Sequence, residues 1–253
     1  MGGESLKQNI YDHPKFFNQY ISLRESGITY NDFVEQPAIK SLIPTLKDKT
    51  VLDLGCGTGD FASYCIENGA AKVLAIDISK NMIDRAMKEN YHEKIEYLCS
   101  PFEDFELHNQ TFDLIISSLA IHYIEDYEGL ISKVTHLLTD GGEFIFSTEH
   151  PMVTARKNMN NWVRDEEGNK LHWAVDHYQE EGMRKEYWYI DGVIKYHRTI
   201  STLLNTIIKK GLVLEEIVEP TSIPIGLEKM PKLINEQRKP SFLVIKAKKG
   251  NRK

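Results

Sequence analysis

The chain has 253 residues, of which 41% are hydrophobic and 27% charged, enough apolar material for one sizeable domain and too much for a disordered chain. Lys and Arg total 31 against 37 Asp and Glu, and this net charge of −6 argues against a duplex-binding protein. No run of 18 apolar residues and no basic segment leading into an apolar one is present, so the sequence predicts neither a membrane span nor a secretory signal. The 3 cysteines form no CxxC pair, as is typical of a reducing compartment, and we expect a cytoplasmic protein.

The first half of the chain alternates between helical and strand patterns. Residues 1–37 carry aromatic and apolar side chains at roughly helical spacing and predict an N-terminal helical segment, which is followed by a short helix ending near residue 46. Between residues 38 and 150, short apolar runs predict strands over 50–55, 72–79, 94–100, 112–120 and 143–149. Amphipathic patterns predict helices over 61–69, 79–90 and 127–138, with a turn at 140–142. This alternation predicts an α/β fold with a doubly wound, mostly parallel sheet.

The second half interrupts this alternation and then resumes it. Residues 151–197 contain all 3 tryptophans, several tyrosines and spaced glycines, and predict an inserted cap of short strands and loops. Over residues 198–253 the patterns predict a helix and two further strands, 212–220 and 241–249. The link between these two strands is short, so the last strand is expected to pair antiparallel and to complete a seven-stranded sheet.

A glycine-rich turn follows the first predicted strand of the sheet. The strand over 51–54 runs directly into Gly55, Gly57 and Gly59 and then into a helix. Glycines permit a tight turn and a close approach of backbone to ligand. The spacing is GxGxG, and Asp60 occupies the third glycine position of a dinucleotide fingerprint, where its charge would repel a phosphate. No Gly-Lys-Ser/Thr follows, which excludes a P-loop, so the turn favours a ligand without phosphate.

An acidic residue ends the second predicted strand. Asp77 lies 18 residues beyond Gly59, and a carboxylate at this strand end can accept hydrogen bonds from both hydroxyls of a ribose. The glycine turn and Asp77 together predict an adenosine-type site.

The motifs VLDLGCGTGDFA, VLAIDIS, FDLIISSLAIHYIED and LLTDGGEFIFSTEH lie between residues 38 and 150. As a set they resemble the class I S-adenosylmethionine-dependent methyltransferases, and most closely the small-molecule group that includes ubiquinone- and menaquinone-biosynthesis enzymes. The resemblance implies a Rossmann-like methyltransferase fold, S-adenosyl-L-methionine as cofactor and methyl transfer to a small-molecule acceptor. The acidic balance and the lack of a long apolar run lead us to expect neither a nucleic-acid nor a membrane partner.

The resemblance also implies roles for individual residues. The methionine part of the cofactor would lie along the turn formed by Gly55, Cys56, Gly57, Thr58 and Gly59, with Asp53 beneath it near the amino group. Asp77 would bind the ribose hydroxyls, and Ile78 and Met82 would pack on the adenine.

Three further regions complete the implied cofactor site. Family members often carry an acidic residue after the third strand, where this chain has Pro101, so either the backbone of Phe102 or Glu103 would contact the adenine amino group. Ser117 and Leu119 would lie near the sulfonium, and Tyr30 belongs to the N-terminal segment expected to cover the cofactor as a lid.

Three residues at strand ends are candidate catalytic groups. His122 follows the fourth strand and His150 the fifth, and a histidine pKa suits proton removal near neutrality. Tyr123 is a weaker candidate. For each, a pocket-shaping role is the alternative, because methyl transfer needs a base only where the acceptor must lose a proton. No metal site is predicted.

Two other functions remain open from the sequence. A nicotinamide-dependent oxidoreductase would use the same kind of sheet, although Asp60 in place of the third glycine argues against it. A non-catalytic member that binds the cofactor as a sensor or assembly partner would share every motif. Nucleic-acid methylation is disfavoured by the acidic balance and by SSLA after the fourth strand, where an Asn/Asp-Pro-Pro-Tyr/Phe motif would stand.

Overall fold

The computed structural model describes residues 7–107, 110–158 and 161–250. The first six residues of the expected lid and the last three of the expected C-terminal segment therefore lie outside the described residues. So do residues 108–109 of the expected core and 159–160 of the expected cap. None of the helices within the described ranges combines the length and hydropathy that a membrane span requires.

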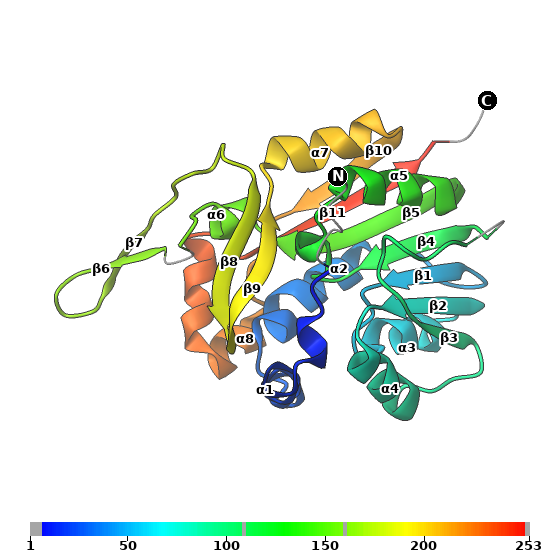
Figure 1. The fold of residues 1–253 in the computed structure, drawn as a ribbon, viewed down its shortest axis with the longest axis horizontal. Helices are drawn as coiled ribbons and strands as arrows, with labels where there is room; N and C mark the ends of the chain where they lie inside the picture. Colours follow the sequence, from blue (N-terminus) through cyan, green and yellow to red (C-terminus); the bar gives the residue numbers. More distant parts are fainter. Residues whose placement is uncertain (1–6, 108–109, 159–160, 251–253) are drawn as a thin grey trace, which may run out of the picture.

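A seven-stranded sheet forms the centre of the molecule, in the order β10-β11-β5-β4-β1-β2-β3 (Figure 1). Its strands are β1 (Thr50–Leu54), β2 (Lys72–Asp77), β3 (Ile95–Cys99), β4 (Phe112–Ser117), β5 (Leu138–Glu149), β10 (Leu212–Val218) and β11 (Phe242–Lys249). The first five pair in parallel, whereas β11 runs antiparallel to both β5 and β10. The predicted doubly wound sheet with an antiparallel last strand is confirmed.

One strand boundary differs from the sequence prediction. The turn expected at 140–142 lies inside β5, which begins at Leu138. Phe112 pairs with Leu138 but Leu114 pairs with Glu143, so the extra residues bulge out between two paired stretches. The glycines therefore mark a bulge within a strand rather than its start.

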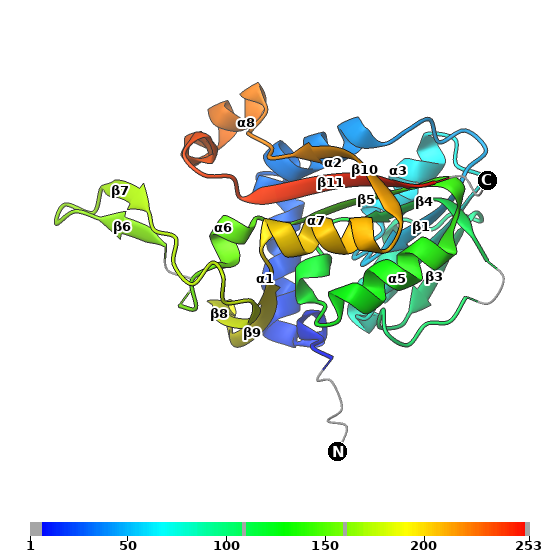
Figure 2. The same ribbon diagram turned by 90° about the horizontal axis from the view of Figure 1, so that it is seen from above.

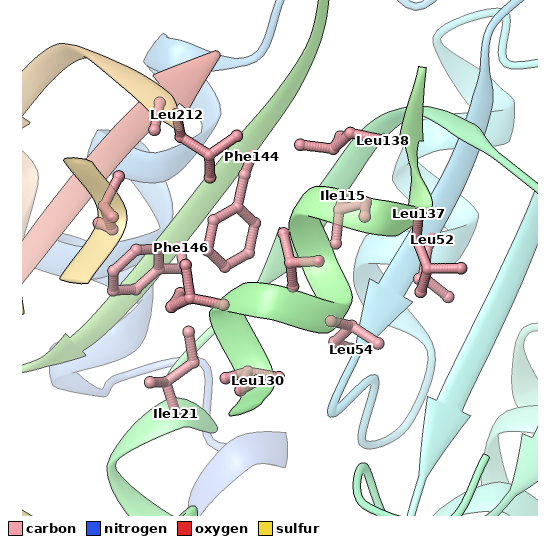
Figure 3. Packing of buried hydrophobic residues seen from close by; sticks show 14 of the residues in the cluster. Leu52, Leu54, Ile115, Ile121, Leu130, Leu137, Leu138, Phe144, Phe146 and Leu212 are labelled. Carbon is pink, nitrogen blue, oxygen red and sulfur yellow. The ribbon is translucent and has the colours of Figure 1, made fainter. Parts of the chain in front are cut away.

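Helices cover both faces of the sheet (Figure 2). On one face α2 (Gln36–Leu42), α3 (Asp60–Glu67) and α4 (Lys80–Glu89) contribute to a core that includes Val51, Val73 and Leu114. On the other face α5 (Tyr127–Leu137) and α7 (Ile200–Lys209) pack on alternate residues of the same strands, such as Leu52 and Ile115 (Figure 3). Because apolar side chains point both ways, the central strands are buried on both faces, which explains their continuous hydrophobic runs.

The N-terminal segment comprises η1 (Ile10–Asp12), α1 (Pro14–Glu25) and η2 (Asn31–Glu35), a π-helical stretch that leads into α2. Asp12 anchors it to α4: its carboxylate accepts the Ser79 hydroxyl at 2.6 Å and the backbone N–H of Asn81 at 3.0 Å. Burial works against ionisation here, but these hydrogen bonds hold the pKa of Asp12 below its usual range. Asp12 thus acts as an additional cap on a helix 67 residues away in sequence.

The insertion after β5 contains α6 (Pro151–Thr154) and two hairpins, β6 (Trp162–Arg164) with β7 (Lys170–Trp173) and β8 (Gly182–Trp188) with β9 (Ile190–His197). The β6–β7 hairpin extends away from the sheet (Figure 2). The β8–β9 hairpin contacts the N-terminal segment, because Gln8 both donates to and accepts from the backbone of Ile194. The connection between β10 and β11 contains α8 (Pro224–Lys229) and η4 (Pro231–Gln237).

Candidate functional site

A cavity of about 460 Å³ lies at the carboxyl ends of the parallel strands, a size typical of small-ligand pockets. Its walls come from the N-terminal segment, the strand ends, the β8–β9 hairpin and the connection before β11. Most residues singled out in the sequence line it: Tyr30, Asp53, Gly55, Cys56, Gly57, Thr58, Asp77, Ile78, Met82, Phe102, Glu103, Leu119, His122 and Tyr123.

Three of the predicted site residues are absent from this lining. Gly59 begins α3 with a positive φ, and a Cβ there would lie 2.5 Å from the hydroxyl of Tyr97. Ser117 is buried and donates to the carbonyl of Leu54. The ring of His150 caps α6 through Nδ1 and bonds Glu219 at 2.8 Å through Nε2. The structure therefore gives these three residues packing and positioning contacts instead of contacts with the cavity.

The glycine turn is held against β2 by backbone hydrogen bonds. The N–H groups of Gly55 and Cys56 both donate to the carbonyl of Ile76, at 2.8 and 3.0 Å. Gly55 has a positive φ, and a Cβ there would meet Ala120 at 2.4 Å, so no other residue fits this position. The Gly57 N–H donates to Asp77 Oδ2 at 2.9 Å. The turn and the acid predicted from the sequence are thus bonded to each other.

Two carboxylates, the half-buried Asp77 and the buried Asp53, lie at this end of the cavity. Asp77 Oδ1 accepts the Ser79 N–H at 2.8 Å, yet burial raises the pKa of Asp77 to about 6. Asp53 is 1% exposed, and its Oδ2 has no hydrogen-bond partner within the described residues. Burial, followed by repulsion from Asp77 and Asp60, raises the pKa of Asp53 to about 8. A cation placed beside Asp53 would therefore be strongly favoured.

Arg24, on α1, supplies a half-buried cation to the same cavity. Its guanidinium lies 3.7 Å from carboxylate oxygens of Asp32 and Asp60. Among the described residues its Nη1 atom is buried without any hydrogen-bond partner. An anion with two oxygens would satisfy this group.

The opposite end of the cavity contains His122, Tyr123 and Glu149. Burial lowers the pKa of His122 to about 4, and its Nδ1 accepts the Glu149 N–H at 3.5 Å. The neutral ring therefore carries its proton on Nε2. Burial raises the pKa of Tyr123 well above its usual range, so its hydroxyl stays protonated. In this geometry both residues are hydrogen-bond donors near neutral pH.

The loop after β4 is held in place by buried polar groups. Leu119 adopts a positive φ of 50°, and its N–H donates to the Ser147 hydroxyl at 2.9 Å. Ser147 and Ser118 both donate to the fully buried carboxylate of Glu35, at 2.5 and 2.8 Å. Burial raises the pKa of Glu35, whereas these two hydroxyls oppose the rise. The network fixes the position of Leu119 at the cavity wall.

Sequence reasoning missed several lining residues. Tyr11, Tyr20 and Arg24 come from the N-terminal segment, where only helical spacing was apparent. Glu149 precedes the predicted His150 at the end of β5, so position at a strand end was its only signal. Trp188 lies in the tryptophan-rich insertion, which the sequence predicts as a cap without assigning this residue to the site.

Comparisons with known proteins agree with this site. Residues 52–146 match the family model described as a methyltransferase domain. The solved structure of an S-adenosylmethionine-dependent methyltransferase from Mesorhizobium loti is 37% identical with a TM-score of 0.79, covering 85% of this chain and 97% of that one. An uncharacterized protein of Haemophilus influenzae is 36% identical over 96% of this chain and 98% of its own length.

A more distant relative matches a shorter stretch of the chain. The ubiquinone biosynthesis O-methyltransferase of Coxiella burnetii is 34% identical over 106 residues, which cover 41% of this chain and 45% of that protein. The glycine turn, the strand-end acid and the relatives that match almost end to end lead to one conclusion. This chain belongs to the S-adenosylmethionine-dependent methyltransferases.

Proposed function

We propose that this methyltransferase acts on a small-molecule acceptor, which binds in the same cavity as the cofactor. The observation that carries the proposal is the continuity of the cavity from Gly57 and Asp77 at one end to Glu149 and Trp188 at the other. A space of about 460 Å³ that is roofed by the N-terminal segment suits a small molecule better than a polymer. The Coxiella relative, named for ubiquinone biosynthesis, is consistent with this class of acceptor.

The cofactor fits the unpartnered groups of the cavity. S-adenosylmethionine carries an ammonium and a carboxylate on its methionine part. Near the glycine turn, Asp53 Oδ2 and Arg24 Nη1 are both buried and make no hydrogen bond within the described residues. Both are linked to Asp60, which lies 3.7 Å from Arg24 and raises the pKa of Asp53. In this proposal Asp53 binds the ammonium and Arg24 binds the carboxylate.

The adenosine part is assigned to the β2 end of the cavity. Each Asp77 oxygen accepts one backbone N–H and keeps a second lone pair, so the pair can accept the two ribose hydroxyls. Ile78 and Met82 provide an apolar surface for the adenine, and Phe102 or Glu103 remains the candidate for its amino group.

When bound, the cofactor supplies an electrophilic methyl group on sulfur. The residues of this chain contribute orientation and exclusion of water, which in well-aligned cases lowers a barrier by about 7–11 kcal/mol. His122 and Tyr123 donate hydrogen bonds from the wall beside Leu119 and so hold an acceptor in line. We assign the N-terminal segment to 37 the role of lid and residues 151–197 that of cap. We also place the protein in the cytoplasm, because its cysteines at 56, 65 and 99 are all free.

The test is release of S-adenosylhomocysteine from S-adenosylmethionine in the presence of a panel of small molecules. We expect time-dependent release with at least one of them and its loss in Asp77→Ala. Release that requires a nucleic acid or a protein would contradict a small-molecule acceptor. Tight binding of the cofactor without release of S-adenosylhomocysteine in the presence of any acceptor would instead favour a non-catalytic protein that binds the cofactor as a sensor.

A further inference from the structure

Glu149 carries the third unpartnered charged group of the cavity lining. Its Oε1 accepts from Lys195 Nζ at 2.6 Å, while its Oε2 is buried and has no hydrogen-bond partner within the described residues. Its side chain is 19% exposed, and Glu149 contributes to the cavity wall. A buried carboxylate oxygen without a partner is costly, so native proteins nearly always satisfy such a group with protein, water or ligand.

Glu149 shares its closest cation with a second carboxylate. Lys195 also pairs with Glu186, so two carboxylates share a single ammonium group. Burial alone would favour the neutral acid, but Lys195 keeps the pKa of Glu149 below its usual range and the carboxylate ionised. The nearby His122 ring is neutral and adds no positive charge. The cluster therefore favours a bound cation over a neutral or anionic group.

Aromatic side chains also line the cavity. Tyr11, Tyr20, Tyr123 and Trp188 line it, and their rings lie edge to face in a packed group. Trp188 already has Lys195 Nζ at 5.3 Å from its ring centroid, so its ring lies next to charge. Aromatic faces beside a carboxylate are the usual surroundings of a bound ammonium group.

Position in the sheet separates Glu149 from the part of the site assigned to the cofactor. It ends β5, two strands from β1, which carries Asp53. At the usual spacing between strands, the two strand ends are about 10 Å apart. The cofactor ammonium bound at Asp53 cannot also satisfy Glu149, so we assign the partner of Oε2 to the second ligand.

We propose that the acceptor is a small amine whose protonated amino group binds to Glu149, with its apolar body against Tyr123 and Trp188. This inference rests on the proposed function, because it names the class of acceptor that occupies the same cavity. It concerns the anchoring group and leaves open which atom receives the methyl group.

The test compares matched fragments on protein saturated with S-adenosylhomocysteine. Benzylamine, benzyl alcohol and benzoate share one skeleton and differ in charge, and their affinities can be measured by ligand-observed NMR. We expect the amine to bind at least about tenfold more tightly than the other two, since only it compensates the carboxylate. Glu149→Gln should reduce this preference to less than about threefold.

Glu143→Gln is the matched control. Glu143 lies on the same strand and pairs with Lys246 at 3.2 Å, and its side chain is 15% exposed, but it is absent from the cavity wall. This variant should keep the full preference for the amine. Loss of the preference in both variants would overturn the assignment to Glu149.

S-adenosylhomocysteine binding separates the two proposals. If it binds and the amine shows no advantage over the alcohol or the carboxylate, or does not bind, the amine inference is wrong while the cofactor site stands. If it fails to bind wild-type protein, the proposed function itself fails. Normal binding to Glu149→Gln shows that this variant is folded.

Discussion

Asp77 Oδ2 accepts the backbone N–H of Gly57 at 2.9 Å, and this bond joins the end of β2 to the glycine turn after β1. The same carboxylate accepts the Ser79 N–H on its other oxygen. Asp77 therefore shapes the turn in addition to offering lone pairs to a sugar. Loss of its side chain should disturb cofactor binding in two ways, through the lost sugar contact and through a less ordered turn.

Asp77→Ala should weaken binding of S-adenosylhomocysteine by more than about tenfold, because two hydrogen bonds to a charged acceptor are lost. Titration calorimetry measures this. Asp84→Ala is the control, since Asp84 is an exposed partner of Lys80 on α4 and does not contact the cavity. Equal affinities for the two variants would contradict the ribose assignment.

Asp53→Asn should change the number of protons that the protein releases when it binds S-adenosylhomocysteine. Free protein holds a proton on Asp53 at pH 7, because the pKa is about 8, and a cofactor ammonium should expel it. Calorimetry in buffers of different ionisation enthalpy should therefore detect release of up to about one proton by wild-type protein. The variant should lack this release. The same proton count in both would show that no cation binds at Asp53.

The pKa of Asp53 also makes stability depend on pH. Because its folded-state pKa lies far above the usual value near 4, the folded state binds the proton more tightly than the unfolded state. This contribution is present at low pH and is lost as pH rises through about 8. Thermal unfolding without cofactor should show that Asp53→Asn is more stable than wild type at pH 8. If the stability advantage of Asp53→Asn over wild type is no larger at pH 8 than at pH 6, Asp53 is not desolvated in the folded protein.

Arg24→Met should weaken the binding of S-adenosylhomocysteine but leave the binding of 5′-methylthioadenosine unchanged, because the latter lacks the amino-acid part. We expect a loss of about tenfold or more for the first ligand, measured by calorimetry. Arg85→Met is a matched control, as Arg85 pairs with Glu25 and Glu89 outside the cavity wall. An equal loss of affinity for both ligands would show that Arg24 stabilises the fold and does not bind the cofactor carboxylate.

Asp12→Ala should loosen the N-terminal segment. Its carboxylate accepts hydrogen bonds from Ser79, Lys80 and Asn81 at the start of α4, and loss of such a cap costs about 1 kcal/mol. Hydrogen exchange should become faster in α1 and in the first turn of α4, and Asp84→Ala should not reproduce this. Unchanged exchange in α1 would show that other contacts hold the segment.

The parts of this protein predicted well from sequence are local ones. The glycine turn, its strand and Asp77 lie within one βαβ unit, where steric demands and strand ends are visible in the order of residues. The mostly parallel pairing of the sheet follows from the alternation of strands and helices along the chain. The position of His150 at a strand end could be predicted from the sequence. Its hydrogen bond to Glu219, 69 residues away, could not, and this bond holds the ring out of the cavity wall.

The acceptor end of the cavity could not be predicted in the same way. Glu149 and Lys195 are 46 residues apart, and Gln8 and Ile194 are 186 apart, so neither pairing leaves a periodic or spaced pattern in the chain. Arg24 lies on a helix whose polar residues resemble any solvated face. Only tertiary structure shows that its guanidinium lies beside Asp60 with its Nη1 atom buried.

A crystal structure of the protein with S-adenosylhomocysteine tests the central claim most directly. We predict ribose hydroxyls on the Asp77 carboxylate, the amino group on Asp53 and the terminal carboxylate on Arg24, with space left before Glu149. A ligand bound elsewhere, or a sugar that does not contact Asp77, would contradict the account.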